Sequence, residues 1–305
     1  MGKKTEHHLY ENINTHCFHI IFDFDENGNV CQSEDEWCEE IFTQIPYFAF
    51  GDKKAREKFD AEENVVKNSM KLLYNIKEIQ EANTDYLENP KQPDDGKYLN
   101  RGEFGELILY YLLKKKLNRP QLISKIYFKD TYNAVVHGFD AVHYDKITNE
   151  LWIGESKLYT SKYHALRELE GDLTSHFNQN FFGQEFTIIS DRFKDLGVDN
   201  SELESLIDPN SKFLSKLVSM NACFFALFND PILDSFSYEP ASDNISQAFL
   251  EKLKKSVQKT RENFDQNTNN FPYKNSLKIH LFLFPVQNKQ SLVKKLHEKL
   301  KKEQI

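Results

Sequence analysis

The spacing of apolar residues divides the chain into segments with strand and helix periodicity. From Phe18 to Phe24 every second residue is large and apolar, which predicts a strand over residues 16–24 with one buried face. Spacings of three and four predict helices over 33–45, 53–82, 101–117, 163–177, 201–220 (broken near Pro209), 246–264 and 290–303. Apolar runs predict strands over 122–128, 135–143, 150–159, 222–228 and 277–284, and residues 181–193 fit either type.

The order of these elements predicts the fold class and a domain boundary. From residue 101 onward, a helix, three strands, a helix and further strands indicate an α/β fold with a central mixed sheet flanked by helices. Residues 83–100 contain two prolines, a glycine and an Asp-Asp pair, which are typical of a linker. We therefore expect an N-terminal α+β accessory region used for partner docking, residues 1–95, and a second domain, residues 96–305.

Net charge narrows the ways in which this chain could bind nucleic acid. It has 39 basic and 47 acidic residues, so its formal charge is 39 − 47 = −8. Domains that bind nucleic acid through bulk charge are usually basic, so local geometry or a partner would have to supply that contact.

The apolar runs are too short to span a bilayer, and the four cysteines show no C-x-x-C spacing. We expect a cytoplasmic protein with reduced thiols.

The strand over residues 150–159 carries charge where its apolar face should continue. It begins with two apolar residues on one face and ends with Glu155 and Lys157 on that same face. This Glu-x-Lys sequence occurs once in the chain. An exposed ion pair at a strand end is the structural alternative to a functional role.

A second carboxylate is expected beside Glu155. A hairpin through residues 145–149 would set Tyr144 opposite Leu151, and the same register sets Asp140 opposite Glu155. Two carboxylates held close together repel unless a cation lies between them. Oxygen ligands of this kind suit Mg²⁺ or Mn²⁺.

These residue types in this pattern indicate metal-dependent phosphodiester hydrolysis. A bound metal lowers the pKa of water and polarises a phosphoryl group, and Lys157 could orient that water or stabilise developing negative charge. Glu106 lies on the helix over 101–117, which is apolar on nearly all sides, so this acid needs a partner such as the metal or Lys157. Glu103 is the competing acid, and the helix dipole alone explains its place in the first turn.

Three sequence motifs contain the candidate acids and the amine: R-G-E-x-G-E at 101–106, H-G-F-D-A-V at 137–142 and W-I-G-E-S-K-L-Y at 152–159. Together they resemble the PD-(D/E)xK nuclease superfamily and, more narrowly, the HamA family of the Hachiman antiphage defence system. The resemblance implies a restriction-endonuclease-like core with Glu106 on its first helix. Phe139 stands where the superfamily name has proline, and this variation leaves the acidic residues in place.

The resemblance also implies a function, a cofactor and a partner. It implies a DNA endonuclease effector with little sequence preference, dependent on Mg²⁺ (or Mn²⁺) and controlled by a partner helicase, HamB. The implied metal contacts are Asp140, Glu155, Glu106 and the backbone carbonyl of Ser156, with Lys157 as the catalytic amine.

Two alternative functions and two terminal segments remain to be tested. The chain could instead be a non-catalytic subunit that binds or regulates a helicase through a degenerate nuclease fold, or a nuclease for RNA or modified DNA. The His7-His8 pair near the start is expected in a mobile terminus rather than in a metal site. The basic helix over 290–303 has an apolar stripe that suits either the core or an anionic partner.

Overall fold

The protein is built on a six-stranded mixed sheet, and the computed structural model describes residues 3–73, 102–123, 138–195 and 201–304. The strand order is β1-β2-β8-β7-β6-β5. The strands are β1 (Thr5–Tyr10), β2 (Thr15–Ile20), β5 (Ala141–Asp145), β6 (Glu150–Leu158), β7 (Met220–Asn229) and β8 (Lys278–Val286). The four central strands are parallel, and β1 and β5 are antiparallel edge strands. The expected α/β fold with a mixed sheet is confirmed.

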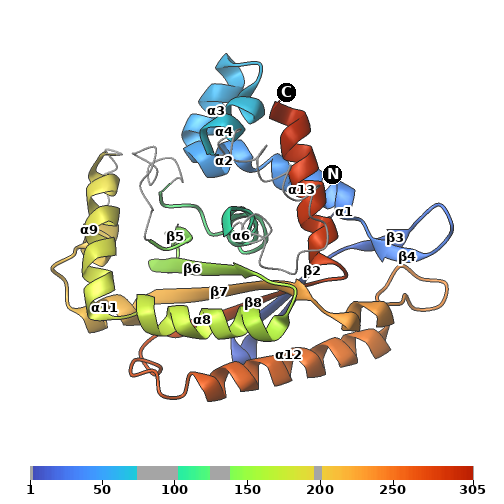
Figure 1. Ribbon diagram of the computed structural model, residues 1–305. Coiled ribbons are helices and arrows are strands. Elements are labelled where there is room, and N and C mark those ends of the chain that lie inside the picture. Colours follow the sequence, from blue (N-terminus) through green and yellow to red (C-terminus); the bar gives the residue numbers. More distant parts are fainter. Residues whose placement is uncertain (1–2, 74–101, 124–137, 196–200, 305) are drawn as a thin grey trace, which may run out of the picture.

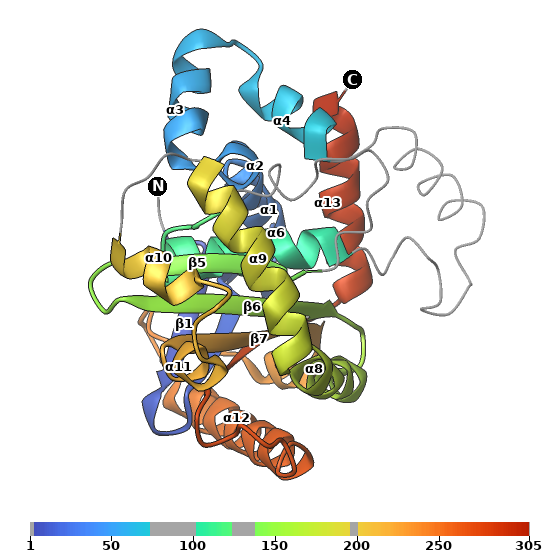
Figure 2. The same cartoon turned by 90° about the vertical axis from the view of Figure 1, so that its left-hand side faces the viewer.

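Helices cover both faces of this sheet (Figure 1). One face carries α6 (Gly102–Tyr111) and α13 (Lys289–Gln304), with α1 (Glu34–Phe42), α2 (Ile45–Phe50), α3 (Asp52–Ala61) and α4 (Val65–Leu73) above them. The opposite face carries α8 (Lys162–His176) and α12 (Gln247–Asn267). At one end of the sheet lie α9 (Gln179–Asp195), α10 (Ser201–Ile207) and α11 (Phe213–Val218), as Figure 2 also shows. Among the described residues, no helix has the length and apolar character to cross a bilayer.

The sheet separates two hydrophobic clusters because side chains alternate along each strand. The cluster on the α8 and α12 side includes Ile153, Phe224 and Leu281. Their chain neighbours Trp152, Phe225 and Phe282 belong to the cluster on the α6 and α13 side. A strand buried on both faces in this way reads as a continuous apolar run, which is why the sequence predicted β7 and β8 well.

Helix α6 lies against β6 at two glycines. A Cβ atom at Gly105 would lie 2.8 Å from the Oγ atom of Ser156 and 2.6 Å from the Cδ1 atom of Leu158. A Cβ atom at Gly154 would lie 2.6 Å from the Cδ2 atom of Leu109. The missing side chains therefore allow the helix to sit directly on one face of the strand, and the other face is left to α8.

The β5–β6 hairpin has the register expected from the sequence. Tyr144 pairs with Leu151, and the last pair at the other end is Ala141 with Gly154. Asn149 in the turn has a φ of 54°, and its Oδ1 atom accepts a hydrogen bond of 2.8 Å from the hydroxyl of Tyr144. Asparagine tolerates this left-handed conformation better than most residues, so the turn residue helps to fix the register.

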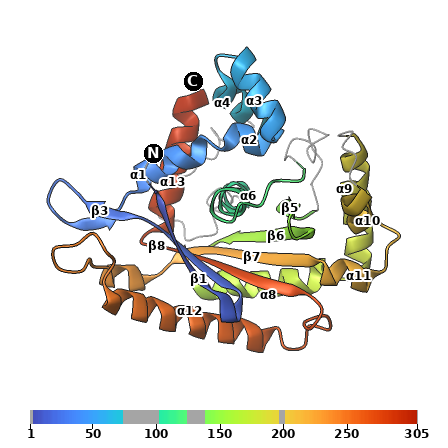
Figure 3. The ribbon, with the colours of Figure 1, turned by 180° about the vertical axis from the view of Figure 1, so that it is seen from behind.

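The N-terminal residues form a strand rather than the mobile terminus that we expected. Residues 5–10 are β1, which pairs with β2 at the edge of the sheet, as the rear view in Figure 3 shows. Histidines sit where a strand pattern would have apolar residues: the Nε2 atom of His7 lies 3.0 Å from Nδ1 of His16, and the Nε2 atoms of His8 and His19 are 3.1 Å apart. Because these positions hold polar residues, the apolar spacing of the sequence did not predict this strand.

Several other expected elements differ in their limits. The strand over 16–24 is divided, because β2 ends at Ile20 and a separate hairpin of β3 (Phe22–Phe24) and β4 (Val30–Gln32) follows. The helix over 53–82 is broken into α3 and α4, and its last part lies outside the described residues. The segment 181–193 is helical, within α9. Of the strand expected over 122–128, only residues 122 and 123 are described. The strand expected over 135–143 begins later, because residues 138–140 are not in a strand and β5 runs from Ala141 to Asp145.

The expected domain boundary remains a prediction, because residues 83–100 lie outside the described part of the chain. Strands from both expected regions nevertheless share one sheet, since Thr15, His16 and Cys17 of β2 pair with β8. The N-terminal region therefore contributes two strands to the same sheet that carries β6.

Candidate metal centre

The end of β6 brings an acid and an amine onto the face covered by α8. Glu155 is only 3% exposed, and Lys157 follows it on the same face. Their neighbours on β7 are Phe224 and Ala226, which belong to the hydrophobic cluster on that side. Glu155 and Lys157 therefore lie where the apolar face of β6 would otherwise continue. Each needs a hydrogen-bonding or charged partner there, because burial of an unpaired charge is costly.

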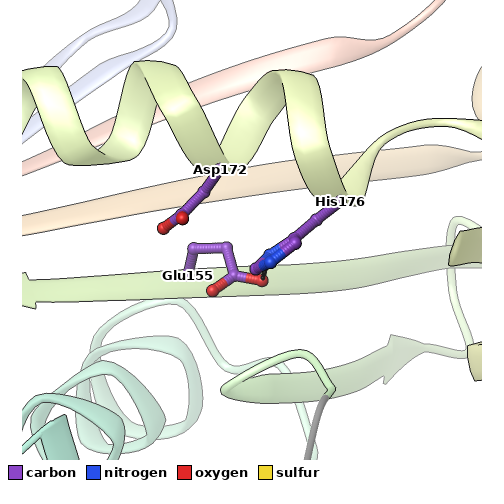
Figure 4. Close-up of side chains that lie close together, drawn as sticks. All are labelled: Glu155, Asp172 and His176. Atoms are coloured by element: carbon purple, nitrogen blue, oxygen red, sulfur yellow. Dashed lines mark hydrogen bonds and ion pairs between the residues drawn. The ribbon is translucent and has the colours of Figure 1, made fainter.

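Helix α8 supplies those partners, as Figure 4 shows. Asp172 and His176 are four residues apart, so they project from the same face of the helix toward the strand. The Nδ1 atom of His176 lies 2.7 Å from Oε1 of Glu155. The Nζ atom of Lys157 lies 2.8 Å from Oδ2 of Asp172. Glu155 of the strand thus pairs with His176 of the helix, and Lys157 pairs with Asp172 beside it.

Burial determines the protonation of the Glu155–His176 pair. Burial, reinforced by the charge of Asp172, raises the pKa of Glu155 well above its usual range. Burial also lowers the pKa of His176, although the same aspartate opposes that change. Both directions favour a neutral pair at neutral pH, in which one proton is held between the carboxyl and imidazole groups.

Lys157 remains charged in this setting. Burial alone would lower its pKa, but the hydrogen bond and charge of Asp172 outweigh that effect, so the pKa of Lys157 is raised.

Glu185 of α9 is a further buried acid near Glu155 and His176. Burial raises the pKa of Glu185 to about 7, and the charge of His176 opposes this shift. A Cβ atom at Gly138 would lie 2.8 Å from Oε2 of Glu185, so this glycine leaves room for the carboxyl group.

Asp140 lies one residue before β5 and contacts β6 directly. Its Oδ2 atom accepts two hydrogen bonds from Ser156, 2.8 Å from the backbone nitrogen and 2.6 Å from Oγ. Its charge also acts on Lys157 and His176. The structure therefore brings Asp140 to the residue between Glu155 and Lys157.

Glu106 approaches the centre from the other side of β6. It lies on α6, next to the glycine that contacts Ser156, and its side chain is half-buried. Its negative charge contributes to the raised pKa of Glu155. The side chain of Glu103, the competing acid, lies outside the described residues.

Three of these side chains lie close enough together to share a cation. Glu155, Asp172 and His176 each offer one ligand atom, and these atoms all lie within 4.8 Å of one another. Carboxylate oxygens and imidazole nitrogen are common ligands of divalent metals. The surrounding charge fits as well, because Glu106 and Asp140 add negative charge near the single ammonium group of Lys157. The donor set therefore suits a divalent cation.

Sequence reasoning missed the residues that α8 and α9 contribute. The segment 163–177 was expected to be a helix, and the spacing Asp172-x-x-x-His176 puts two metal-ligating residue types on one helix face. That spacing was the available signal, but it indicates nothing until the helix is known to cover the face of Glu155. Glu185 carried no comparable signal.

Comparison with known proteins identifies one family. The HamA family model matches residues 2–300, which is nearly the whole chain. No curated protein and no solved structure matches the chain.

Proposed function

Because the chain belongs to the HamA family, a component of Hachiman antiphage defence, we propose that it is a metal-dependent DNA endonuclease controlled by a partner helicase. It would hydrolyse phosphodiester bonds with little sequence preference. The observation that carries this proposal is the meeting of Glu155 and Lys157 with acidic and imidazole groups on one buried row. An exposed ion pair at a strand end would not bury its carboxylate or gather further acids around it.

Each side chain has a defined part in the proposed reaction. Asp140, Glu155, Glu106 and the carbonyl oxygen of Ser156 are the expected contacts of a divalent cation, Mg²⁺ or Mn²⁺. Such a cation, when bound, lowers the pKa of water and polarises a phosphoryl group. The Lys157 ammonium group stabilises negative charge that develops on the phosphate in the transition state.

Two contacts support that role of the lysine. The ion pair with Asp172 holds the ammonium group at the end of β6, and it keeps the pKa of Lys157 raised. The hydrogen bonds from Ser156 likewise hold Asp140 beside the acid-x-lysine sequence. Charged groups that are fixed before the substrate arrives need little reorganisation during the reaction.

A partner helicase fits the charge of the chain. With a net charge of −8, the protein lacks the bulk positive charge that concentrates DNA on a surface. A helicase subunit such as HamB would deliver the strand and determine when it reaches β6. DNA is thus proposed as the substrate, and control by the helicase as the regulation.

The proposal is tested with Glu155→Gln and Lys157→Met in the full chain, assayed with and without the helicase subunit. We expect Mg²⁺-dependent cleavage of DNA by the wild type and a loss of about 100-fold or more in each variant, because both changes remove charge without removing volume. The matched controls are Glu168→Gln on α8 and Lys146→Met in the hairpin turn, which are exposed and should retain activity.

Three outcomes separate the alternatives. Undiminished cleavage in both variants would remove these residues from the mechanism. Binding to the helicase without cleavage in any divalent metal would favour the non-catalytic subunit. Parallel reactions with RNA of the same sequence test the proposed choice of DNA.

A further inference from the structure

The ligand set at the centre contains a nitrogen atom as well as oxygen atoms. Glu155 and Asp172 offer carboxylate oxygens, and His176 offers an imidazole nitrogen within the same 4.8 Å group. Mg²⁺ and Ca²⁺ take oxygen ligands, whereas first-row transition metals, Mn²⁺ included, also accept an imidazole nitrogen. A mixed set of this kind therefore discriminates between cations that a purely acidic set would bind alike.

We propose that Glu155, Asp172 and His176 form a site for a divalent first-row transition metal, and that this site binds Mn²⁺ in preference to Mg²⁺. Two of its three ligands come from α8, which carries none of the motifs that resemble the nuclease superfamily. The inference deepens the proposed function and rests on its premise that a cation occupies this end of β6.

The imidazole ring of His176 is already oriented for this role. It stacks on the ring of Phe181, with ring centroids 4.5 Å apart and an angle of 12° between the planes. The ring of Phe139 meets it edge-on at 6.5 Å. Packing on two sides restricts rotation of the ring, so little side-chain entropy would be lost when a metal binds.

Asp172 can contribute a ligand without releasing Lys157. Its Oδ2 atom is 2.8 Å from the ammonium group, but a carboxylate has two oxygens with about four lone-pair positions. The Asp172 carboxylate can therefore face the lysine and the cation together. Its position between Lys157 and Glu155 links the proposed metal site to the proposed catalytic amine.

The site also needs positive charge. The carboxylates of Glu155 and Asp172 act on each other, and Glu106 and Glu185 add to the field at Glu155. Lys157 supplies one positive charge against these groups. A divalent cation would take the place of the proton shared by Glu155 and His176 and would offset the charge of the surrounding carboxylates.

The experiment measures metal binding by the full chain without DNA. Free Mn²⁺ is followed by electron paramagnetic resonance during titration, and Mg²⁺ is then added to displace it. We expect the wild type to bind Mn²⁺ about tenfold or more tightly than Mg²⁺. His176→Asn should weaken Mn²⁺ binding about 10- to 100-fold and change Mg²⁺ binding little, so that the preference is lost.

Two further variants keep the test decisive. His164→Asn changes an exposed histidine on the same helix and should leave both affinities unchanged. Asp172→Asn should weaken binding of both metals, because it removes the negative charge of a carboxylate ligand that both accept. Far-ultraviolet circular dichroism establishes that each variant is folded before it is titrated.

The outcomes distinguish this inference from the proposed function. Equal wild-type affinities for the two metals, or an unchanged preference in folded His176→Asn, would overturn the inference while leaving nuclease activity intact. A chain that binds Mn²⁺ through His176 but cleaves no nucleic acid would support the inference and reject the proposed nuclease.

Discussion

At the residue scale, the centre depends on a strand that carries different side chains on its two faces. Ser156 points toward α6 and holds Asp140, whereas Glu155 and Lys157 point toward α8. A single strand thus connects groups from both layers of helices. A small change in the distance between α6 and β6 should therefore move Ser156 and, with it, the carboxylate of Asp140 that it binds.

This dependence predicts the effect of a methyl group at Gly105. Gly105→Ala should destabilise the fold by about 1–3 kcal/mol, because the new Cβ atom would lie 2.8 Å from Oγ of Ser156 and 2.6 Å from Leu158. The displaced hydroxyl would also weaken its bond to Asp140, so cleavage should fall as well. Urea unfolding measures the first effect and the DNA assay measures the second.

Gly171 provides the matched control for that substitution. It lies exposed in the interior of α8, and a Cβ atom there would have no neighbour within 4 Å. Gly171→Ala should raise the free energy of unfolding by about 0.5–1 kcal/mol, the usual gain in helix propensity. Equal effects at the two glycines would contradict the close contact of α6 with β6.

At the element scale, the β5–β6 hairpin sets the position of Asp140. The turn ends at Asn149 in a left-handed conformation, and the hydroxyl of Tyr144 donates a hydrogen bond to its side chain. A slip of one residue would move Glu155 and Lys157 to the wrong face, because side chains alternate along the strand. The turn therefore matters for the site as well as for the sheet.

Substitution of Asn149 tests this role of the turn. Asn149→Val should cost about 1–3 kcal/mol, because a β-branched residue is strained at a φ of 54° and the hydrogen bond from Tyr144 is lost. Asn149→Gly should cost less, since glycine adopts this backbone conformation freely. Thermal unfolding of the two variants gives the comparison, and a larger loss in the glycine variant would show that the backbone conformation is not the cause.

At the scale of the whole molecule, several strands of the sheet carry buried or half-buried histidines. Burial lowers the pKa of five of them from 6.5, to about 3 in one case and about 4 in the others: His16, His7, His19, His143 and His280. These residues lie on the two edge strands, β1 and β5, and on β2 and β8 of the parallel part of the sheet. Each is neutral in the folded protein at neutral pH.

These histidines predict a loss of stability in mild acid. They bind protons more readily in the unfolded chain, so the stability they provide is complete above pH 6.5 and is lost as the pH falls toward 4. For His143, which is fully buried, the shift corresponds to about 3 kcal/mol. Glu155 and Glu185 act in the opposite direction, because their raised pKa values stabilise the fold when they are protonated.

Chemical unfolding between pH 7.5 and 4.5 measures the balance. With five histidines against two carboxyl groups, we expect the free energy of unfolding to fall as the pH is lowered. His143→Gln should reduce the slope by about 1.4 kcal/mol per pH unit below pH 6, and exposed His164→Gln should not change it. A stability that rises toward pH 5 would contradict this account.

Predictions from the sequence were most accurate where the pattern was local. The segments that became β6, β7, β8, α8 and α12 were found close to their observed limits, because β7 and β8 are continuous apolar runs and the other three have a regular apolar spacing. The pairing of Tyr144 with Leu151 also followed from a short hairpin, in which a few residues determine the register; the ladder ends at Ala141 and Gly154, and the next residue, Asp140, bonds to Ser156. β1 was missed because its two half-buried histidines break the apolar pattern, and their partners, His16, His19 and Phe18 of β2, are known only from the tertiary structure.

The sequence by itself determined that an acid and an amine share one face of β6 and that an aspartate lies beside them, because alternation and hairpin register depend on near neighbours in the chain. Only the tertiary structure decided that Asp172 and His176 meet Lys157 and Glu155. The rotation and position of α8 depend on packing against residues such as Phe224, far away in the sequence. The period of a helix gives the residues on one face, but not the surface that this face will cover.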